Sequence, residues 1–409
     1  LGQAFSARAR AAHRVAGSLD AVQCDYFDAG LCHSCTLMGV PYTAQLAEKQ
    51  ARVEALLAPF LAGPRDAVWG EPVASVESGF RAKAKMVVGG TVDAPTLGIL
   101  DGQRRGVDLR RCGVIAAPIL DALPAIAAFI TTAGLTPYSV PERRGELKNV
   151  ILTVGADGLL MVRFVTRTAD GLERVRRHLP ALLAAVPAAH VVTVNLLPEH
   201  KAVLEGEEEQ VLTPARALPM RVGEVKLAAL PQSFVQTNTA VAGELYRQAA
   251  AWIDEVAPAS VADLYCGVGG FALHAAGAPG SGRQVVGVEV SRDAVASATL
   301  ARDARYGRDD DRARIRFIAD DALEWARREA ALPELVVVNP PRRGLGEALS
   351  TLLAERGPDT IVYSSCNPDT LARDLAAMPG YRVERARVVD MFPQTTHVEV
   401  LTLLQRTGR

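Results

Sequence analysis

The sequence has no long hydrophobic run. The best candidate, residues 119–135, is interrupted by Asp121 and Pro124, so it falls short of the roughly 18 uninterrupted apolar residues of a membrane helix. The first 20 residues contain Arg and Ala but lack the apolar segment of a secretory signal. These two absences predict a cytoplasmic protein without a membrane span, in which residues 1–20 form an N-terminal extension.

An excess of charge of one sign is also missing. Lys and Arg together number 45, and Asp and Glu number 46. Overall charge therefore gives no attraction to nucleic acid, and any affinity for RNA has to come from a local basic surface. Internal repeats and low-complexity segments are absent as well. Apolar residues make up 49% of the 409 residues, which is enough to fill the cores of two or more globular domains.

Cysteine is scarce, with six residues in two groups. The first group is Cys24, Cys32, Cys35 and Cys112, and the second is Cys266 and Cys366. In a reducing compartment such cysteines are buried, catalytic or metal-binding rather than paired in disulfides. The spacing of the first group suits either zinc or an iron–sulfur cluster, and the spacing alone does not decide between them.

The remaining pattern divides the chain into three parts. Residues 21–63 hold the cysteine loop and a helix with apolar spacing over 42–63. Residues 64–225 are rich in strands, including two joined across 156–158, and predict a central α+β domain that binds RNA. Residues 226–409 predict a methyltransferase-type α/β domain, for the reasons that follow.

In this last part short apolar strands alternate with helical segments, which is typical of a parallel sheet covered by helices on both faces. The final two strands are joined only by residues 393–396, a link too short for a parallel crossover. We therefore expect a Rossmann-like, mostly parallel sheet whose last strand is antiparallel.

A glycine-rich turn follows the first of these strands. In DLYCGVGGFAL, Gly267 and Gly269 allow a ligand to approach the backbone, with Ala272 at the third position of the motif. Glu289 lies at the end of the next strand, where a carboxylate binds ribose hydroxyls. The pattern predicts a nucleoside pocket and fits NAD and S-adenosylmethionine equally well.

The sequence NPPRRG at 339–344 favours S-adenosylmethionine. Its prolines fix a rigid turn after the fourth parallel strand, and Asn339 points into the site, as in methyltransferases. Enzymes that methylate exocyclic amines have an aromatic residue after the prolines, whereas this chain has Arg342. The predicted target atom is therefore not an amine.

Two further residues are predicted at the same edge of the sheet. Cys366 ends a parallel strand, and Glu399 shares one face of the antiparallel last strand with His397. A thiolate that adds to carbon 6 of uracil activates carbon 5 for methylation, and a base then removes the proton from carbon 5. Cys366 and Glu399 suit these roles. The alternatives are a small buried hydrophobic residue for Cys366 and an exposed edge-strand charge for Glu399, while Cys266 is better explained as a packing residue.

The motifs DLYCGVGGFAL, NPPRRG, YSSCNP and HVEVLTLL resemble those of the RNA uracil-5-methyltransferase family. The N-terminal sequences QCDYFDAGLCHSC, GFRAKAKMVV and RRGELKNVILT extend the resemblance to about residues 22–406. Within this family the chain is most similar to the members that methylate uracil 747 of 23S ribosomal RNA. The resemblance implies a class I methyltransferase fold, with Cys366 as nucleophile and Glu399 as base. Residues implied to contact S-adenosylmethionine are Gln236, Tyr265, Glu289 and Asn339, with Asp321 expected at the adenine. Gly267 of the glycine-rich turn is expected in the same pocket.

The resemblance also implies a 4Fe–4S cluster on the four N-terminal cysteines, expected to stabilise the fold because methyl transfer needs no electrons. In FRAKAK, one strand face carries Arg81, Lys83 and Lys85. This face is either a solvated surface or a binding site for RNA phosphates, and further arginines nearby favour phosphate binding. The expected partner is 23S ribosomal RNA, with no membrane and no evident obligate protein partner. Two rival functions stay open: uridine methylation in transfer RNA or at another ribosomal site, and a non-catalytic iron–sulfur RNA-binding protein.

Overall fold

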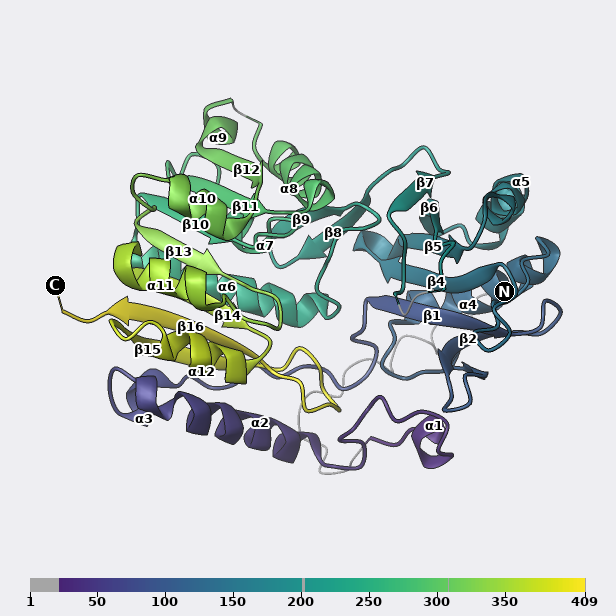
Figure 1. Cartoon of the computed structure of the whole chain (residues 1–409), viewed down its shortest axis with the longest axis horizontal. Coiled ribbons are helices and arrows are strands. Elements are labelled where there is room, and N and C mark those ends of the chain that lie inside the picture. Colours follow the sequence, from purple (N-terminus) through teal and green to yellow (C-terminus); the bar gives the residue numbers. More distant parts are fainter. Residues whose placement is uncertain (1–21, 201–202, 308, 409) are drawn as a thin grey trace, which may run out of the picture.

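The computed structural model describes residues 22–200, 203–307 and 309–408 (Figure 1). The predicted extension 1–20 lies outside the described residues. Within these ranges, no helix combines the length and the apolar character of a membrane span. Two large sheets organise the chain, one in the central domain and one in the C-terminal domain.

The central domain is built on a seven-stranded sheet with the order β3-β2-β1-β4-β5-β6-β7. Its strands are β1 (Lys83–Gly90), β2 (Pro95–Leu100), β3 (Gly106–Asp108), β4 (Leu147–Val154), β5 (Leu160–Thr166), β6 (Ala189–Leu196) and β7 (Glu208–Val211). Helices α4 (Ala117–Thr132) and α5 (Ala169–Ala185) pack on one face of this sheet and form its core. The strands β4 and β5 are the antiparallel pair predicted around 156–158, joined by the short turn η2 (Ala156–Gly158). The sequence also predicts a short strand over 201–205, but residues 203–205 form no strand, and residues 201–202 lie outside the described residues.

The C-terminal domain has the predicted alternation of strands and helices. Its sheet order is β12-β11-β10-β13-β14-β16-β15, in which β10 to β14 are parallel and β16 is antiparallel to both of its neighbours. The strands are β10 (Ser260–Leu264), β11 (Gln284–Glu289), β12 (Ile315–Ala319), β13 (Leu335–Val338), β14 (Thr360–Ser365), β15 (Tyr381–Val389) and β16 (Glu399–Arg406). The expected mostly parallel sheet with an antiparallel last strand is therefore confirmed.

Helices cover both faces of this sheet, because its central strands are apolar on both sides. One face packs against α6 (Thr239–Val256), α7 (Gly270–Ala275) and α8 (Arg292–Arg305). The other face packs against α10 (Ala322–Arg328), α11 (Glu347–Arg356) and α12 (Pro368–Ala376). The short helix α9 (Asp309–Arg314) precedes β12.

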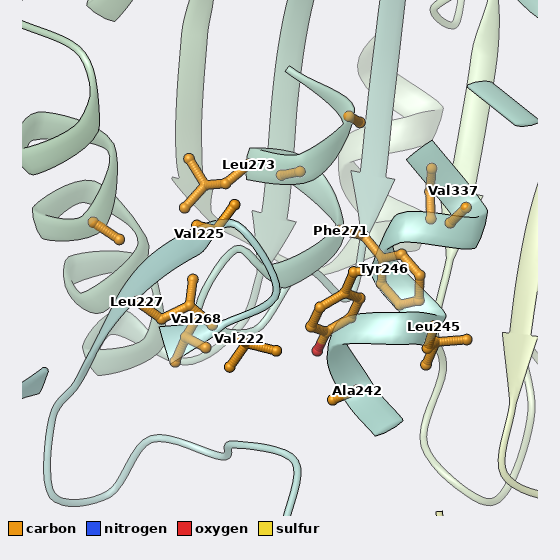
Figure 2. Close-up of a cluster of buried hydrophobic side chains, with 14 of the residues drawn as sticks. Val222, Val225, Leu227, Ala242, Leu245, Tyr246, Val268, Phe271, Leu273 and Val337 are labelled. Atoms are coloured by element: carbon orange, nitrogen blue, oxygen red, sulfur yellow. The ribbon is translucent and has the colours of Figure 1, made fainter. Parts of the chain in front are cut away.

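A two-stranded hairpin, β8 (Leu218–Val222) and β9 (Val225–Ala229), links the two domains. Figure 2 shows its valines and Leu227 packed with side chains of α6 and α7 and with Val268 of the glycine-rich turn. The glycine-rich turn packs against this apolar cluster, and the close packing holds the turn in a fixed position.

The N-terminal segment packs against the C-terminal domain, as its position beside α12 and β15 in Figure 1 shows. Its elements are α1 (Asp25–Asp28), α2 (Tyr42–Leu57), η1 (Ala58–Phe60) and α3 (Arg65–Val68). The helix expected over 42–63 stops at Leu57, and a short 3-10 turn containing Pro59 follows, because proline has no amide hydrogen to donate to an α-helix. Beyond it, the chain forms parallel bridges to β15 through Leu61, Trp69 and Val73. These bridges cover the outer edge of the sheet.

Candidate active site and cysteine pocket

The predicted site residues gather at one edge of the C-terminal sheet. Tyr265, Glu289 and Asn339 lie at or just beyond the carboxyl ends of β10, β11 and β13, and Cys366 follows β14. Because β16 runs in the opposite direction, its first residue, Glu399, lies at this edge too. This is the edge at which open parallel sheets bind ligands.

The glycine-rich turn has the backbone that its sequence predicts. Tyr265, Gly267 and Gly269 all have positive φ, at 68°, 53° and 85°. A Cβ at Gly269 would come within 3.1 Å of both Ala298 and Phe317, so glycine is needed there for conformation and for close packing. The turn leaves the backbone bare where a nucleoside would lie.

Glu289 is tied to this turn. One of its carboxylate oxygens accepts a hydrogen bond from the amide of Gly267 at 3.2 Å, and the other accepts from the amide of Ser291 at 2.9 Å. The side chain is half-buried. A carboxylate oxygen has lone pairs to spare after one such bond, so Glu289 could still accept from ribose hydroxyls.

The other predicted contacts come from three separate segments. Asp321 is the exposed N-cap of α10 and accepts from the amides of Leu323 and Glu324. Asn339 and Gln236 are half-buried, Asn339 after β13 and Gln236 in the segment between β9 and α6. Asp321 and Asn339 follow β12 and β13 and so lie at the edge of the sheet where the glycine-rich turn lies.

Sequence reasoning missed Asp263, which lies under the turn. It is fully buried and accepts a hydrogen bond from the amide of Ala272 at 2.8 Å, which anchors α7 to β10. The pKa of Asp263 is raised to about 8, chiefly by burial and to a smaller extent by nearby Glu289, while the bond from Ala272 acts in the opposite direction. The acidic residue that opens DLYCGVGG was a signal for this position, but the motif was interpreted through its glycines.

The pairing of β14 with β16 places Cys366 beside Glu399. The last paired residues are Ser364 with Leu401 and Ser365 with Val400, so the next position opposes Cys366 to Glu399. Side chains at directly opposed positions point to the same face of the sheet. Ser364 lies on that face as well, and its hydroxyl donates a hydrogen bond to the Glu399 carboxylate.

Burial sets the acidity of both groups. It raises the pKa of Glu399 to about 7, although the bond from Ser364 acts in the opposite direction. Burial also raises the pKa of the Cys366 thiol, and the Glu399 charge raises it further, while Arg342 lowers it. A carboxylate of this pKa is a competent base near neutral pH, and Arg342 is the group that favours the thiolate.

Cys366 opens into a cavity of about 210 Å³. Its lining residues are Arg52, Arg342, Cys366, Asn367, Pro368, Thr396, His397 and Val398. His397, predicted on the same strand face as Glu399, is exposed at this cavity. Arg52 was not predicted, because it belongs to helix α2, more than 300 residues away in sequence.

The first turns of α12 hold the loop that carries Arg342. The Arg342 carbonyl accepts from the Asn367 side chain at 3.1 Å and from the Thr370 hydroxyl at 3.3 Å. Farther along the loop, buried Asp374 accepts from the amide of Leu345 at 2.7 Å. The segment that follows Cys366 therefore fixes the position of Arg342 beside it.

The four N-terminal cysteines line a second cavity, of about 220 Å³. As placed, no group of three or more His, Cys, Asp or Glu side chains among the described residues is arranged to hold a metal ion. All four are free thiols. They are nevertheless close enough to interact, since the pKa of Cys35 is raised to about 11, first by burial and then by Cys112, Cys32 and Cys24.

In the cationic row that leads into β1, Arg81 and Lys85 are exposed and Lys83 is half-buried. Lys85 forms an ion pair with Glu205 at 3.6 Å. Burial, together with Arg163 and Lys85, lowers the pKa of Lys83 to about 8. The side chains of this row do face away from the buried Ala82, Ala84 and Met86, as the alternation predicts, but Glu205 neutralises part of the surface.

Comparison with known proteins identifies what the chain resembles. A family model described as tRNA (Uracil-5-)-methyltransferase matches residues 214–407. The 23S rRNA (uracil(747)-C(5))-methyltransferase RlmC of Shewanella amazonensis is 46% identical over 386 residues, which cover 94% of this chain and 97% of that protein. The enzyme of the same name from Cronobacter sakazakii is 44% identical and is covered over 100% of its length.

A solved structure has the same fold. The tRNA (uracil-54, C5)-methyltransferase of Pyrococcus abyssi, in complex with S-adenosyl-L-homocysteine, superposes with a TM-score of 0.73. The match covers 90% of this chain and 85% of that one at 24% sequence identity. At this identity the likeness establishes the fold.

Proposed function

The chain belongs to the RNA uracil-5-methyltransferase family, and from this premise we propose that it methylates carbon 5 of a uridine in 23S ribosomal RNA. S-adenosylmethionine is the methyl donor. The relatives at 44–46% identity are named for uracil 747, which makes that nucleotide the first target to test. Ribosomal RNA is then the macromolecular partner, and the cytoplasm is the compartment that this substrate implies.

The observation that carries the proposal is the pairing of Cys366 with Glu399. A nucleophilic thiol and a buried base of pKa about 7 face the same way, at the edge of the sheet where the glycine-rich turn lies. A non-catalytic RNA-binding protein would have no need for this pair. Methylation of an unactivated carbon needs both groups.

The residues act in sequence on the uracil ring. The Cys366 thiolate adds to carbon 6, and the electron pair of the 5,6 double bond moves toward the carbonyl oxygen at carbon 4 to give an enolate. Carbon 5 then takes the methyl group from the sulfonium of the donor, which leaves as a thioether. Glu399 accepts the proton from carbon 5, the 5,6 double bond re-forms, and Cys366 departs as a thiolate.

The donor pocket is assigned to the residues around the glycine-rich turn. Glu289 would accept from the ribose hydroxyls, and the bare backbone at Gly267 would allow the donor to approach. Tyr265, Asn339 and Gln236 would complete the contacts. Asp321 is assigned to the adenine, next to the first turn of α10.

A 4Fe–4S cluster is proposed on Cys24, Cys32, Cys35 and Cys112. The four thiols line one cavity and come from two parts of the chain, as ligands of a cluster that joins them would. A bound cluster would cross-link the N-terminal loop to the central domain. Arg81 lines the same cavity, and with Lys83 and Lys85 it is assigned to contacts with RNA phosphates.

The test separates the two catalytic roles. Wild type, Cys366→Ala and Glu399→Gln would each be incubated with methyl-labelled donor and a 23S ribosomal RNA fragment containing uridine 747. Glu399→Gln keeps the nucleophile and loses the base, so we expect methyl-labelled RNA that stays attached to the protein through denaturing electrophoresis. Cys366→Ala should give neither adduct nor methylated RNA.

Two controls define the target. The same fragment with uridine 747 replaced by cytidine should give no product, and a transfer RNA transcript should remain unmethylated. Methylation by Cys366→Ala, or an adduct that mass spectrometry maps to Cys266, would disprove the mechanism. Methylation of the transfer RNA alone would replace the proposed substrate.

A further inference from the structure

Arg52 reaches the catalytic cavity from outside the methyltransferase domain. It lies on α2, in a part of the chain that the family model does not match, yet it lines the same cavity as Cys366, Arg342 and His397. The helix is held there by α12, against which it packs, and by the buried residues Val53 and Leu57 along one face. The position of Arg52 is therefore determined by the fold.

The only ion pair recorded for Arg52 within the described residues joins it to Asp369, at 2.7 Å. Both side chains are exposed, at 49% and 58%, so water screens the pair and it contributes little to stability. Asp369 stands in the first turn of α12, three residues after Cys366. The pair therefore orients the guanidinium at the cavity that Cys366 also lines, and a stronger anion could displace Asp369.

The surroundings favour such an anion. Arg342 adds positive charge to the cavity, and the positive end of the α12 helix dipole faces the same space through Asn367 and Pro368. A uridine whose base reaches Cys366 has left its stack of bases. Its backbone phosphates remain outside the site at which the base reacts. Arginine can bind a phosphate through two parallel hydrogen bonds, whereas the contact between Arg52 and Asp369 is a hydrogen bond from Nη2 to Oδ2 alone.

We propose that Arg52 binds a backbone phosphate next to the uridine that enters the Cys366 cavity, and that Asp369 holds the Arg52 side chain in position until RNA displaces it. The inference rests on the proposed function, since it takes the ligand to be an RNA strand that delivers a base to Cys366. It assigns the N-terminal segment a direct part in substrate binding.

Salt dependence of RNA binding tests the inference. The dissociation constant of the 23S ribosomal RNA fragment containing uridine 747 would be measured over a range of salt concentrations for wild type, Arg52→Ala, Arg52→Lys and Asp369→Ala. Loss of one phosphate contact on single-stranded RNA lowers the log–log slope by about 0.7, which is the change expected for Arg52→Ala. Arg52→Lys should restore most of the slope, and Asp369→Ala should tighten binding because the competing carboxylate is gone.

Arg65→Ala is the matched control. Arg65 belongs to the same N-terminal segment, is exposed and is paired with Glu54 and Asp66, but it does not line the cavity. The salt dependence of RNA binding by Arg65→Ala should have the same slope as that of wild type. A wild-type slope for Arg52→Ala, or an equal loss in Arg65→Ala, would overturn the inference. Failure of the wild-type protein itself to bind and methylate the fragment would instead contradict the proposed function, so the two failures are distinct.

Discussion

Glu399 combines two properties that a base for carbon 5 needs. Its burial keeps water away from the proton acceptor, and its pKa of about 7 leaves a large share of the carboxylate ionised near neutral pH. The Ser364 hydroxyl stabilises the charged form through its hydrogen bond. Without that bond, burial alone would push the pKa higher and keep more of the base protonated.

Replacing Ser364 should therefore shift the pH dependence of proton removal from carbon 5. In Ser364→Ala the pKa of Glu399 rises, so the decay of the methylated adduct should reach half its maximal rate at a higher pH than in wild type and should be slower at pH 7. Single-turnover decay of the adduct, followed from about pH 6 to pH 9, measures this. The rate of adduct formation, which precedes proton removal, should have the same pH dependence in Ser364→Ala as in wild type.

Ser365→Ala serves as the control, because Ser365 points to the other face and bonds to Asn367 rather than to Glu399. Its decay midpoint should match wild type. An unshifted midpoint in Ser364→Ala would show that this hydroxyl does not tune the base.

At the scale of elements, the link between β15 and β16 connects Glu399, the proposed base, to the N-terminal segment. Lys49 of α2 forms a buried ion pair with Asp390 at 2.7 Å and also donates to the Phe392 carbonyl. Gln45, one helical turn earlier, donates a hydrogen bond to the side-chain oxygen of buried Gln394 and accepts one from the backbone amide of Gln394. These contacts hold residues 390–394, and the strand that follows begins with Glu399.

Breaking the ion pair from one side should destabilise the protein strongly. Lys49→Met leaves Asp390, which is fully buried, without its cationic partner, and we expect the free energy of unfolding to fall by about 3–5 kcal/mol. Urea denaturation followed by circular dichroism measures the loss. The double variant Lys49→Met with Asp390→Leu should recover much of it, because both buried charges are then gone.

Arg52→Ala, which breaks an exposed pair on the same helix, should cost only about 0–1 kcal/mol. Equal losses in Lys49→Met and Arg52→Ala would mean that the buried pair has no special part in holding the link.

At the scale of the whole molecule, the cysteine pocket joins three distant parts of the chain. The N-terminal loop contributes Cys24, Cys32 and Cys35, the central domain contributes Cys112, and the β15–β16 link contributes residues 392, 393 and 395. The same link contributes residues 396–398 to the Cys366 cavity. A cluster bound in the pocket would thus stabilise the contact between the two domains beside the active site.

Anaerobically purified protein should be brown and contain about four irons per chain, and Cys35→Ala should lose the colour, the iron and part of the thermal stability. Iron analysis, visible absorption and the melting temperature measure these effects. Cys266→Ala removes a buried thiol outside the pocket and should keep its iron. Zinc without iron in the anaerobic wild-type protein would refute the cluster.

The sequence by itself determined the C-terminal fold and the positions at its catalytic edge. Alternating apolar strands and helices, the glycine-rich turn and the short link before β16 are local patterns, and the observed sheet has the predicted alternation and the predicted antiparallel last strand. Strand direction then places Cys366 and Glu399 at one edge, because the ends of a strand follow from the order of the chain.

Only the tertiary structure decided what approaches that edge from elsewhere. Arg52 lies beside Asp369 across 317 positions, and Lys49 meets Asp390 across 341. Glu205 faces Lys85, and the helix of the predicted cysteine segment packs on the methyltransferase domain. Periodicity reveals which side of α2 is buried but not what covers it, because a contact between distant segments depends on the packing of the whole chain rather than on the residues around either partner.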